Sequence, residues 1–404
     1  MGFHHGLSGL NAASKSLDVS GHNIANSNTI GFKKSRAEFN EMVASAMGSG
    51  QCPGSAGAGI GVSVAAVTQQ FSQGVITPTA NGLDMAINGD GFFVVNTPSG
   101  TAYTRNGAFQ LDKNGFLVTA NGDKVQGWAD ANATGTQPVD LQFPTGAGIP
   151  GRQTTGLSIQ AANLPATAPD AISVTPNTPR HTYGTSLQVY DSQGVAIPVE
   201  VYFVKNGSNT WDVYDSLDPA ATRIGTVTFD GEGKFASTTV TTLNVDPSLA
   251  NPNNPPAPFT VTLDLSGMTQ NDRKWSVDKM TQDGYASGEL TGVNVSKDGT
   301  LMASYSNGLT RPEGKVALAR FTNPQGLAPN GNNNWVQTND SGPVLYGSAG
   351  AGSFGQIQGA ALEESNVDLT AELVGMMTAQ RSYQANAQTI KTQDQVFSTL
   401  VNLR

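Results

Sequence analysis

The C-terminal stretch NVDLTAELVGMMTAQRSYQANAQTIKTQDQVFSTLV, residues 366–401, decides the fold that the sequence predicts. One set of its residues recurs every seven positions: Leu369, Met376, Tyr383, Ile390 and Phe397. A second set follows each of these by four positions: Leu373, Gln380, Ala387, Asp394 and Val401. This heptad is interrupted by no Pro, and by no Gly after Gly375, which is typical of a coiled-coil helix. At a rise of about 1.5 Å per residue, the helix would be about 54 Å long.

The predicted helix needs a partner, because it is weakly stable alone. Gln380 and Asp394 occupy seam positions where a tight two-stranded coil prefers Leu. The other faces carry Thr, Gln, Asn and Ser, with few side chains able to form ion pairs. Ser365 and Asp368 have the spacing of a capping box, which predicts where the helix begins.

The N-terminal stretch supplies a second amphipathic helix. Leu10, Leu17 and Ile24 are also seven residues apart, and the helical pattern ends at the turn formers of residues 26–28. Leu7, Ala13 and Ser20 lie on the same predicted face. This helix of about 20 residues is too short to cover one of about 36. Either the two helices merely clasp a globular domain, or the uncovered stripe binds other copies of the chain; the length mismatch favours self-assembly.

Composition limits the classes of function. Charged residues make up 13% of the 404-residue chain, well below the usual quarter, and the net charge is −9 without a basic block. We therefore expect no nucleic-acid partner. The single cysteine, Cys52, excludes an intrachain disulfide and a cysteine-based zinc cluster. No apolar run approaches the length of a membrane span, and the N-terminus lacks the pattern of a conventional secretory signal, so we expect neither membrane insertion nor a cleaved signal peptide.

Between the helices the sequence predicts mainly β structure. Residues 31–61 are expected to be a linker, with a short helix through Phe39, Met42 and Val43 and a flexible Gly-rich part. From residue 62 the apolar period changes to two. Asn-Gly pairs at 81, 88, 106, 114 and 121 predict hairpin turns, so residues 62–145 are expected to form an antiparallel β unit.

The predicted β segments are nested. Residues 144–179, rich in Pro, Thr and Ala, are expected to mark a boundary before a second antiparallel β unit. Because the two terminal helices should meet, the β segments next to them should meet as well. We therefore expect a discontinuous β domain from 62–145 and 285–361, an outer β domain inserted at 146–284, and a coiled-coil-like helical domain from 1–30 and 362–404. The fold class is mainly β, barrel-like or sandwich-like, with helical termini.

Three stretches resemble the bacterial flagellar rod and hook protein family. The first runs from Leu7 to Lys33 and contains Asn23-Ile24-Ala25-Asn26 and Gly31-Phe32-Lys33. The second consists of residues 84–93, DMAINGDGFF, with residues 103–109, YTRNGAF. The third runs from Glu364 to Asn386. The resemblance extends from end to end, and the large inserted segment points to the hook branch, since rod members are considerably shorter.

The resemblance implies a structural subunit that self-assembles into a hollow, flexible tube and passes torque from motor to filament. It implies homopolymer contacts, neighbours such as the distal rod, hook cap and hook–filament junction proteins, and export by the flagellar type III apparatus to the outside of the cell. Residues of both helical seams would carry the assembly contacts: Leu7, Leu10, Leu17, Ile24, Leu369, Leu373, Met376, Tyr383, Ala387, Ile390, Phe397 and Val401. A rod or junction subunit, and a secreted β-rich adhesin or carbohydrate-active protein, remain as alternatives.

Chemical motifs are weak, and we expect no catalytic, cofactor or metal site. The glycines of residues 350–355 match a dinucleotide fingerprint by letter, but the predicted helix starts some ten residues too late to bind a pyrophosphate. The turns at Asp112 and Asp230 mimic the start of a calcium loop without its twelfth-position glutamate. The four histidines, His4, His5, His22 and His181, have no metal-binding spacing. Tyr and Trp residues of the inserted unit are expected in its sheet core.

Overall fold

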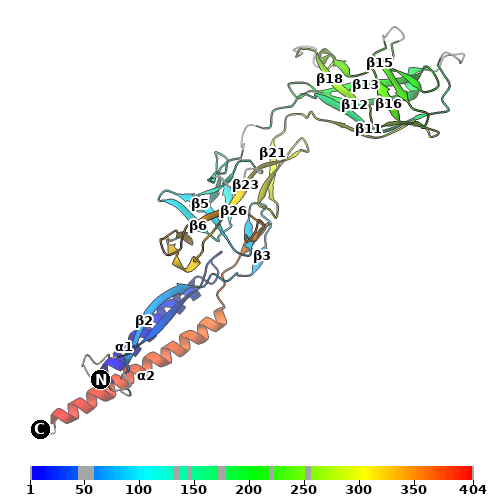
Figure 1. Cartoon of the computed structure of the whole chain (residues 1–404). Coiled ribbons are helices and arrows are strands. Elements are labelled where there is room, and N and C mark those ends of the chain that lie inside the picture. Colours follow the sequence, from blue (N-terminus) through cyan, green and yellow to red (C-terminus); the bar gives the residue numbers. More distant parts are fainter. Residues whose placement is uncertain are drawn as a thin grey trace. The chain divides into compact units, whose positions relative to one another are not determined.

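The computed structural model describes residues 2–43, 59–130, 137–143, 148–171, 179–218, 223–250 and 256–402. The chain is mainly β with one helix near each end, α1 (Gly2–Ala25) and α2 (Leu369–Asn402), as the sequence predicts (Figure 1). It divides into two compact units. The first comprises Met1–Thr145, Gly292–Ser304 and Thr310–Arg404, and the second comprises Gly146–Thr291 and Tyr305–Leu309.

Local sequence sets the ends of both helices. After Ala25 the chain leaves α1 through a turn in which the Asn26 side chain donates a hydrogen bond of 2.9 Å to the His22 carbonyl. α2 begins where the Asp368 carboxylate accepts hydrogen bonds from the backbone N–H groups of Thr370 and Ala371, at 2.9 and 3.1 Å. Asp368 is therefore the N-cap. The capping box that was expected to start at Ser365 is wrong by three residues, since an acid directly before the helix competes better for its free N–H groups.

A hairpin of β1 (Ser35–Val43) and β2 (Gly59–Gln69) contacts α1. The helix expected through Phe39, Met42 and Val43 is wrong, because this segment pairs with β2 as an antiparallel strand. The expected linker, residues 31–61, is thus in part a strand, while its Gly-rich portion at 44–58, including Cys52, lies outside the described residues. The spacing of Phe39, Met42 and Val43 indicates a helix, but in so short a segment periodicity does not distinguish a helix from a strand, and pairing with β2 decides.

The rest of the first unit is built from one large antiparallel sheet and two small ones. The large sheet contains twelve of the described strands, with the order β21-β22-β23-β9-β5-β6-β25-β24 along its main path. The small sheets pair β27 with β4 and β28 with β3. The bounds are β3 (Ile76–Pro78), β4 (Met85–Asn88), β5 (Phe92–Thr97), β6 (Gly100–Thr104), β7 (Phe109–Leu111), β8 (Leu117–Thr119), β9 (Lys124–Trp128), β10 (Val139–Asp140), β21 (Leu290–Val295), β22 (Thr300–Tyr305), β23 (Thr310–Arg320), β24 (Ala328–Pro329), β25 (Asn334–Val336), β26 (Leu345–Ser348), β27 (Gln356–Gly359) and β28 (Ala361–Glu363).

Only two of the five Asn-Gly pairs make hairpin turns. Those at 114 and 121 connect β7 to β8 and β8 to β9, which are paired strands. The pairs at 81, 88 and 106 connect strands that do not pair with each other in the described structure. Asn-Gly supplies the local turn geometry, but the long-range partners of β4 and β5 decide where the chain goes next.

The second unit is a sandwich of two five-stranded sheets, one ordered β12-β13-β14-β15-β16 and the other β17-β18-β11-β19 with β20 also paired to β11. Their bounds are β11 (Gly156–Pro165), β12 (Gly184–Tyr190), β13 (Ala196–Lys205), β14 (Thr210–Tyr214), β15 (Gly225–Phe229), β16 (Phe235–Thr238), β17 (Thr242–Val245), β18 (Phe259–Asp264), β19 (Met268–Asn271) and β20 (Ser276–Gln282). Three short 3-10 turns complete the described elements: Arg180–Tyr183, Pro247–Leu249 and Pro324–Gly326.

One expectation for this unit is wrong. The sheet is not wholly antiparallel, because β11 pairs parallel with β18 and β19. The zone at 144–179 contains the boundary between the two units, at 145/146, but it also contains β11, the central strand of that sheet. The strand is hard to recognise in the sequence, because its buried residues Leu157, Ile159 and Leu164 stand among Thr and Ala residues. Their alternation is also interrupted where the register with β20 shifts.

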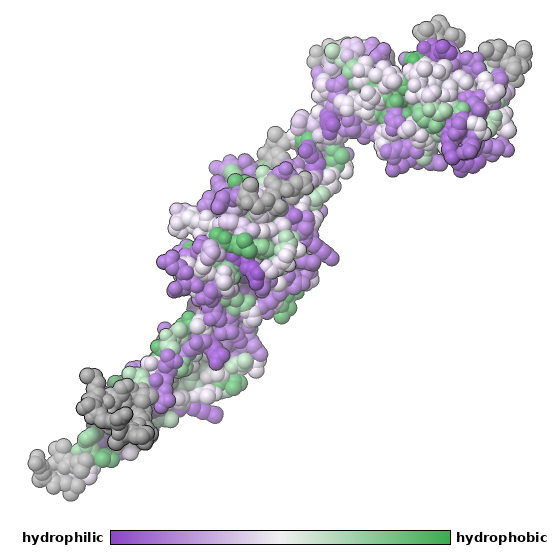
Figure 2. Space-filling model, viewed as in Figure 1, coloured by the Kyte–Doolittle hydropathy of each residue, from purple (hydrophilic) through white to green (hydrophobic). Residues whose placement is uncertain are grey.

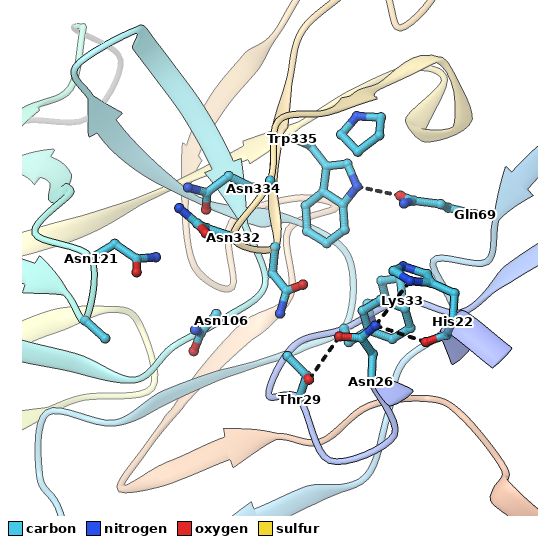
Figure 3. Close-up of a pocket in the computed structure, with 15 residues that line it drawn as sticks. His22, Asn26, Thr29, Lys33, Gln69, Asn106, Asn121, Asn332, Asn334 and Trp335 are labelled. Atoms are coloured by element: carbon cyan, nitrogen blue, oxygen red, sulfur yellow. Dashed lines mark hydrogen bonds between the residues drawn. The ribbon is translucent and has the colours of Figure 1, made fainter. Parts of the chain in front are cut away.

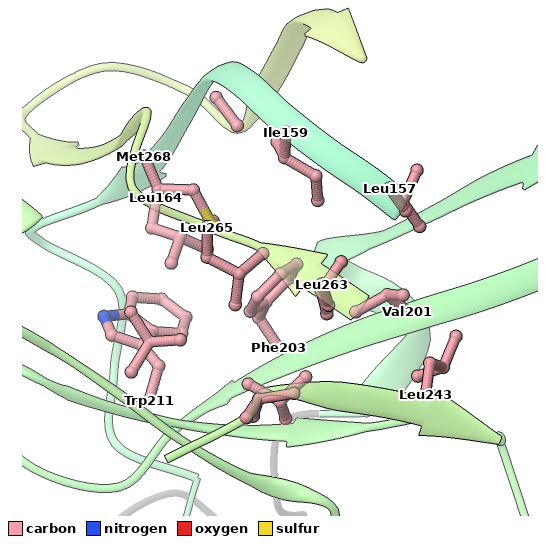
Figure 4. Packing of buried hydrophobic residues seen from close by; sticks show 14 of the residues in the cluster. Leu157, Ile159, Leu164, Val201, Phe203, Trp211, Leu243, Leu263, Leu265 and Met268 are labelled. Carbon is pink, nitrogen blue, oxygen red and sulfur yellow. The ribbon is translucent and has the colours of Figure 1, made fainter. Parts of the chain in front are cut away.

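The two sheets of the second unit enclose one apolar core (Figure 4). Leu164 and Met268 from one sheet pack into the same cluster as Phe203 and Trp211 from the other. Trp211 is fully buried, and its indole N–H donates to the Gln270 side chain at 3.2 Å. The expectation that Tyr and Trp of this unit belong to the sheet core is confirmed for Trp211 and Tyr202, which are both buried.

Candidate assembly interface

α1 and α2 pack side by side and antiparallel through small residues (Figure 1). A Cβ added to Gly6 would lie 2.9 Å from Ile390 Cγ1, and one added to Gly9 would lie 2.8 Å from the Asn386 amide. Ala13 on α1 and Ala379 on α2 are also buried. Glycine and alanine at these positions allow the two helix backbones to approach closely, so the contact depends on shape rather than on large apolar side chains.

The antiparallel register leaves the end of α2 uncovered. α1 has 24 residues and α2 has 34. Since Gly9 lies opposite Asn386 and Gly6 opposite Ile390, continuing the register leaves no described residue of α1 opposite Phe397. Phe397 is accordingly 61% exposed. The length mismatch that the sequence predicts is therefore present between the two helices.

The residues predicted for the seam fall into three groups. Several are exposed: Leu7, Leu369, Leu373, Tyr383 and Phe397. Others are half-buried: Leu10, Leu17, Ile24, Met376, Ala387 and Ile390. The side chain of Val401 lies outside the described part of α2. Within one chain, Gly6 and Gly9 make close contacts with α2. The sequence analysis did not identify them, because a heptad search selects large apolar residues and overlooks glycine.

One face of α2 is apolar and exposed. Leu369, Leu373 and Met377 are four residues apart and so lie along the same side of the helix, with Val374 nearby. These four side chains are between 45% and 54% exposed. Apolar (green) residues are visible on the surface of the helical part in Figure 2. A contiguous exposed apolar face of this kind is a candidate surface for contact with another protein.

The β1–β2 hairpin carries a second exposed apolar patch. Phe39 pairs with Val64 and Ala37 pairs with Val67, so all four side chains lie on one face of the hairpin. Phe39, Val64 and Val67 are between 39% and 44% exposed. We call this set the hairpin patch. Sequence reasoning missed it, because Phe39 was expected in a short helix of the linker, whereas residues from 62 onward were assigned to a separate β unit.

A buried ion triad joins three distant parts of the first unit. Glu363 accepts hydrogen bonds from Lys33 Nζ at 2.6 Å and from Arg105 Nη1 at 3.2 Å, and all three side chains are at most 5% exposed. Burial lowers the pKa of both Lys33 and Arg105 from their ordinary values, while Glu363 opposes this shift by favouring their charged forms. A buried carboxylate shared by two cations is costly to disturb, since removing it leaves both charges unpaired.

Backbone groups complete the triad. Lys33 Nζ also donates to the Ser72 carbonyl and Arg105 Nη2 to the Gly89 carbonyl, each at 2.8 Å. Glu363 Oε1 also accepts from the N–H of Gly74. Gly31, at φ 69°, donates its N–H to the Glu363 carbonyl, and a Cβ there would lie 2.6 Å from the Arg105 carbonyl carbon, so only glycine fits.

Two asparagines fasten the start of the hairpin. Asn23 exchanges two hydrogen bonds with the backbone of Ser35, at 2.8 and 2.9 Å. Asn366 accepts from the N–H of Lys34 at 2.8 Å and donates to the Gln70 carbonyl at 2.7 Å. Together with the triad, these hydrogen bonds connect the C-terminal end of α1, the hairpin and the segment just before α2.

Sequence reasoning assigned the triad residues no role. Lys33 and Arg105 lie within the first and second quoted stretches, and Glu363 directly precedes the third. A usable signal was present at Arg105, which is the one charged residue of the segment 91–111. Charged residues in such settings are buried only when paired.

The turns that mimic ligand loops have structural explanations. Asp112 Oδ1 accepts from the N–H groups of Asn114 and Phe116, at 2.9 and 2.7 Å, and so forms the β7–β8 turn. Residues 350–355 form a turn between β26 and β27. Within the described residues, no three His, Cys, Asp or Glu side chains are grouped as a metal site would need. None of the helices described here is long and apolar enough to cross a membrane.

Four family models match the chain. The flagella basal body rod protein model matches residues 3–33, and the flagellar hook protein FlgE/F/G D1 domain model matches residues 86–166. The flagellar basal body protein FlaE D2 domain model matches residues 160–285, which lie entirely within the second unit. The flagellar basal body rod FlgEFG protein C-terminal model matches residues 358–403, which include Glu363 and α2.

Three relatives that match the chain over nearly its whole length have the same name, flagellar hook protein FlgE. The flagellar hook protein FlgE of Escherichia coli is 43% identical and that of Salmonella typhimurium 42% identical, each over 100% of both chains. The flagellar hook protein FlgE of Borreliella burgdorferi is 33% identical over 99% of both chains. A crystal structure of Helicobacter pylori flagellar hook protein FlgE2 covers 71% of this chain and 100% of its own, with a TM-score of 0.50 and 15% identity, which supports the fold. The chain therefore belongs to the flagellar hook protein FlgE family and is a structural subunit of the bacterial flagellar hook.

Proposed function

We propose that copies of this hook subunit assemble through their terminal helices into a hollow, bendable tube that transmits torque from the rod to the filament. The assembly contacts would use the predicted seam residues of both helices: Leu7, Leu10, Leu17, Ile24, Leu369, Leu373, Met376, Tyr383, Ala387, Ile390, Phe397 and Val401. The nested domains predicted from the sequence, with residues 146–284 inserted into 62–145 and 285–361, would be carried on this helical scaffold.

The exposed apolar face of α2 supports the proposal most directly. Within one chain, α1 covers α2 through Gly6, Gly9 and Ala13 and leaves Leu373, Met377 and Phe397 at least 45% exposed. Full burial of one such side chain stabilises a contact by roughly 1.5–3 kcal/mol. Repeated at every subunit of a polymer, a few such side chains supply a strong driving force for association.

Weak lateral contacts would allow the tube to bend as it rotates. Charged residues are only 13% of the chain, and in the second unit the ion pairs Arg152–Asp283 and Lys234–Glu232 are exposed on both sides. Exposed ion pairs contribute little, and small polar side chains exchange partners easily. Contacts of this kind between neighbouring subunits can lengthen and shorten during each revolution without being locked.

The same proposal covers export and neighbouring proteins. As a hook subunit the chain would leave the cell through the flagellar type III apparatus, without a cleaved signal peptide. Outside the cell it would contact the distal rod, the hook cap and the hook–filament junction proteins, in addition to copies of itself. These partners are expected to use the same exposed helical faces, because rod proteins share the matching N-terminal and C-terminal stretches.

Polar substitution of the exposed face tests the proposal. In the full chain, Leu373→Ser with Phe397→Ser should raise the concentration needed for half-maximal polymerisation by at least tenfold, since about 1.5–3 kcal/mol is lost per side chain. The unfolding of the monomer should be unchanged, because both side chains are exposed there. Leu217→Ser, at a similarly exposed leucine of the second unit, is the matched control.

Sedimentation and electron microscopy provide the readout. The intact chain should form hollow tubes, and a chain lacking residues 1–25 and 369–404, which retains Lys33, Arg105 and Glu363, should remain monomeric. Polymerisation of this shortened chain at the same concentration as the intact one would disprove the role of the helices. Equal polymerisation of the Leu373→Ser, Phe397→Ser variant would exclude the α2 face specifically.

A further inference from the structure

A cavity of about 500 Å³ lies in the first unit beside the end of α1 (Figure 3). Its size falls within the range of ordinary ligand sites. Six asparagines line it: Asn26, Asn106, Asn121, Asn332, Asn333 and Asn334. They come from the turn after α1, the loop between β6 and β7, the turn between β8 and β9, and the loop between β24 and β25 together with the first residue of β25. We call this cavity the asparagine pocket.

Three of these amides have unused hydrogen-bonding capacity. Within the described residues, the side chains of Asn121 and Asn332 make no hydrogen bond, and that of Asn106 uses only its oxygen, which accepts from the Ala108 N–H at 3.0 Å. Figure 3 shows these three side chains around the same space. By contrast, Asn334 donates to Asp123 at 3.2 Å and Asn333 to the Ile30 carbonyl at 3.2 Å. The pocket therefore combines fixed asparagines with asparagines that are free to bind.

The loop that presents Asn332 is held in one conformation. Asn332 and Asn333 have φ angles of 52° and 57°, in the left-handed region, which asparagine occupies more readily than most other residues that carry a side chain. Thr104 Oγ1 donates to the Asn333 carbonyl at 2.9 Å, and this bond fixes the loop to β6.

The lining residues select an uncharged ligand. They include no Asp or Glu. The one lysine that contributes, Lys33, already donates from its ammonium group to Glu363 and to the Ser72 carbonyl. Each free asparagine offers both a donor and an acceptor. The ligand must therefore be neutral and must itself present donors and acceptors, as a peptide backbone or a glycan does.

The buried aromatic residues of the pocket, Trp335 and Phe32, favour a peptide over a glycan. Trp335 is only 3% exposed, with its ring edge-on to Phe71 and Phe92 at centroid distances of 5.5 and 5.7 Å. Its indole N–H donates to the Gln69 side chain, and Phe32 is 7% exposed. With both of these rings buried, a sugar ring has no open indole or phenyl face on which to stack. A peptide group needs no such face, because its N–H and C=O match the amide of an asparagine side chain.

We propose that the asparagine pocket binds an extended, uncharged segment of a second copy of this chain. The inference rests on the proposed self-assembly, which brings many copies together. The pocket lies beside the C-terminal end of α1, where Ile24 is half-buried. A second copy that covers the helices would therefore also reach the pocket. Each copy offers suitable segments, since only 13% of its residues are charged and 47 are glycine.

A double substitution in the full-length chain tests the pocket. Asn121→Ser with Asn332→Gly removes two free amides, and glycine retains the left-handed turn at position 332. The concentration for half-maximal polymerisation should rise roughly tenfold, as expected for two lost hydrogen bonds. The melting temperature of the monomer should not fall. Asn114→Ser, in the neighbouring Asn-Gly turn but outside the pocket, is the control and should polymerise normally.

Photocrosslinking identifies the occupant. A benzophenone amino acid at position 121 should crosslink to a second chain in the polymer but not in dilute monomer, whereas the same group at position 114 should not. Normal polymerisation of the double variant, or crosslinks only within one chain, would overturn the proposal. So would binding of a neutral oligosaccharide such as maltohexaose that the double variant loses. Failure of self-assembly itself would differ, because the unsubstituted chain would then form no helix-dependent tubes.

Discussion

The helix pair and the inserted unit handle their apolar residues in opposite ways. In the second unit, Ile159, Leu164, Phe203 and Trp211 are at most 1% exposed and share one core. On α2, Leu373, Val374 and Phe397 are at least 45% exposed. The sandwich buries its large apolar side chains within a single chain, whereas the helices leave part of theirs exposed to solvent. One region can therefore be stable by itself while the other retains apolar surface for contact with another chain.

The two regions also differ in how they pack. In the sandwich, large side chains from the two sheets pack together, as Trp211 and Phe203 from one sheet do with Leu164 from the other (Figure 4). The helices meet through Gly6, Gly9 and Ala13, with little apolar volume between them. We expect substitutions in the first region to change stability and those in the second to change assembly. The following predictions can break or sharpen this contrast.

The largest effect is expected at the buried triad. Glu363→Ala removes the only carboxylate that bonds Lys33 and Arg105 in the triad, and should destabilise the first unit by about 3–5 kcal/mol. Calorimetry of the full chain should show a lowered transition for that unit and an unchanged one for the sandwich. Glu232→Ala, at the exposed Lys234–Glu232 pair, should have no measurable effect. Equal behaviour of the two variants would mean that the triad is not structural.

A core cavity in the sandwich should come next. Leu164→Ala, at a fully buried residue of β11, should destabilise the second unit by about 2–5 kcal/mol. Denaturant unfolding measures this loss. At a temperature where the variant is still folded, its concentration for half-maximal polymerisation should equal that of the unsubstituted chain. A shift in that concentration would show that the sandwich contributes to assembly more than the contrast allows.

A smaller effect is expected at the helix contact. Gly6→Val places a side chain where a Cβ already lies 2.9 Å from Ile390 Cγ1, and should cost about 1–3 kcal/mol by overpacking. Gly21→Ala, on the same helix with no atom within 4 Å, should instead stabilise the helix by up to about 1 kcal/mol. Helical circular dichroism during thermal unfolding would distinguish the two. Tolerance of valine at position 6 would disprove the close approach of the helices.

The smallest effect concerns pH. Burial alone would raise the pKa of Asp283, but hydrogen bonds from the Thr155 hydroxyl and from the N–H groups of Thr155 and Gly156 outweigh it and lower that pKa. A lowered pKa means that Asp283 stabilises the second unit above its unfolded value, about 3.9, and that this contribution is lost as pH falls through the folded value. Unfolding of Asp283→Asn should therefore depend less on pH between about 5 and 2.

Periodicity in the sequence was sufficient for the two helices and for several of the strands. The seven-residue spacing of Leu369 to Phe397 predicts α2, and the alternation around Trp211 predicts β14. It was insufficient for β1 and β11, where residues of mixed polarity leave the period ambiguous and pairing with distant strands decides. Strand propensity depends on such tertiary partners more than helix propensity does.

The candidate interface was only partly predictable. The heptad spacing of apolar residues identifies Leu373 and Phe397, because it selects large apolar side chains on one face of a helix whether they are buried or exposed. It cannot identify Gly6 or Gly9, whose role is to be small, nor Glu363, whose cations stand 330 and 258 residues away in the chain. Contacts between positions so far apart depend on the completed fold.

The distribution of the triad over three segments restricts how hook subunits can be recombined. A chimaera that takes residues 1–33 from one relative and the remainder from another inherits Lys33 apart from the carboxylate that neutralises it. Such an exchange succeeds only when both parents carry compatible charges at the positions of Lys33, Arg105 and Glu363. Designers who splice new tails onto this protein should therefore transfer the three residues as one inseparable set.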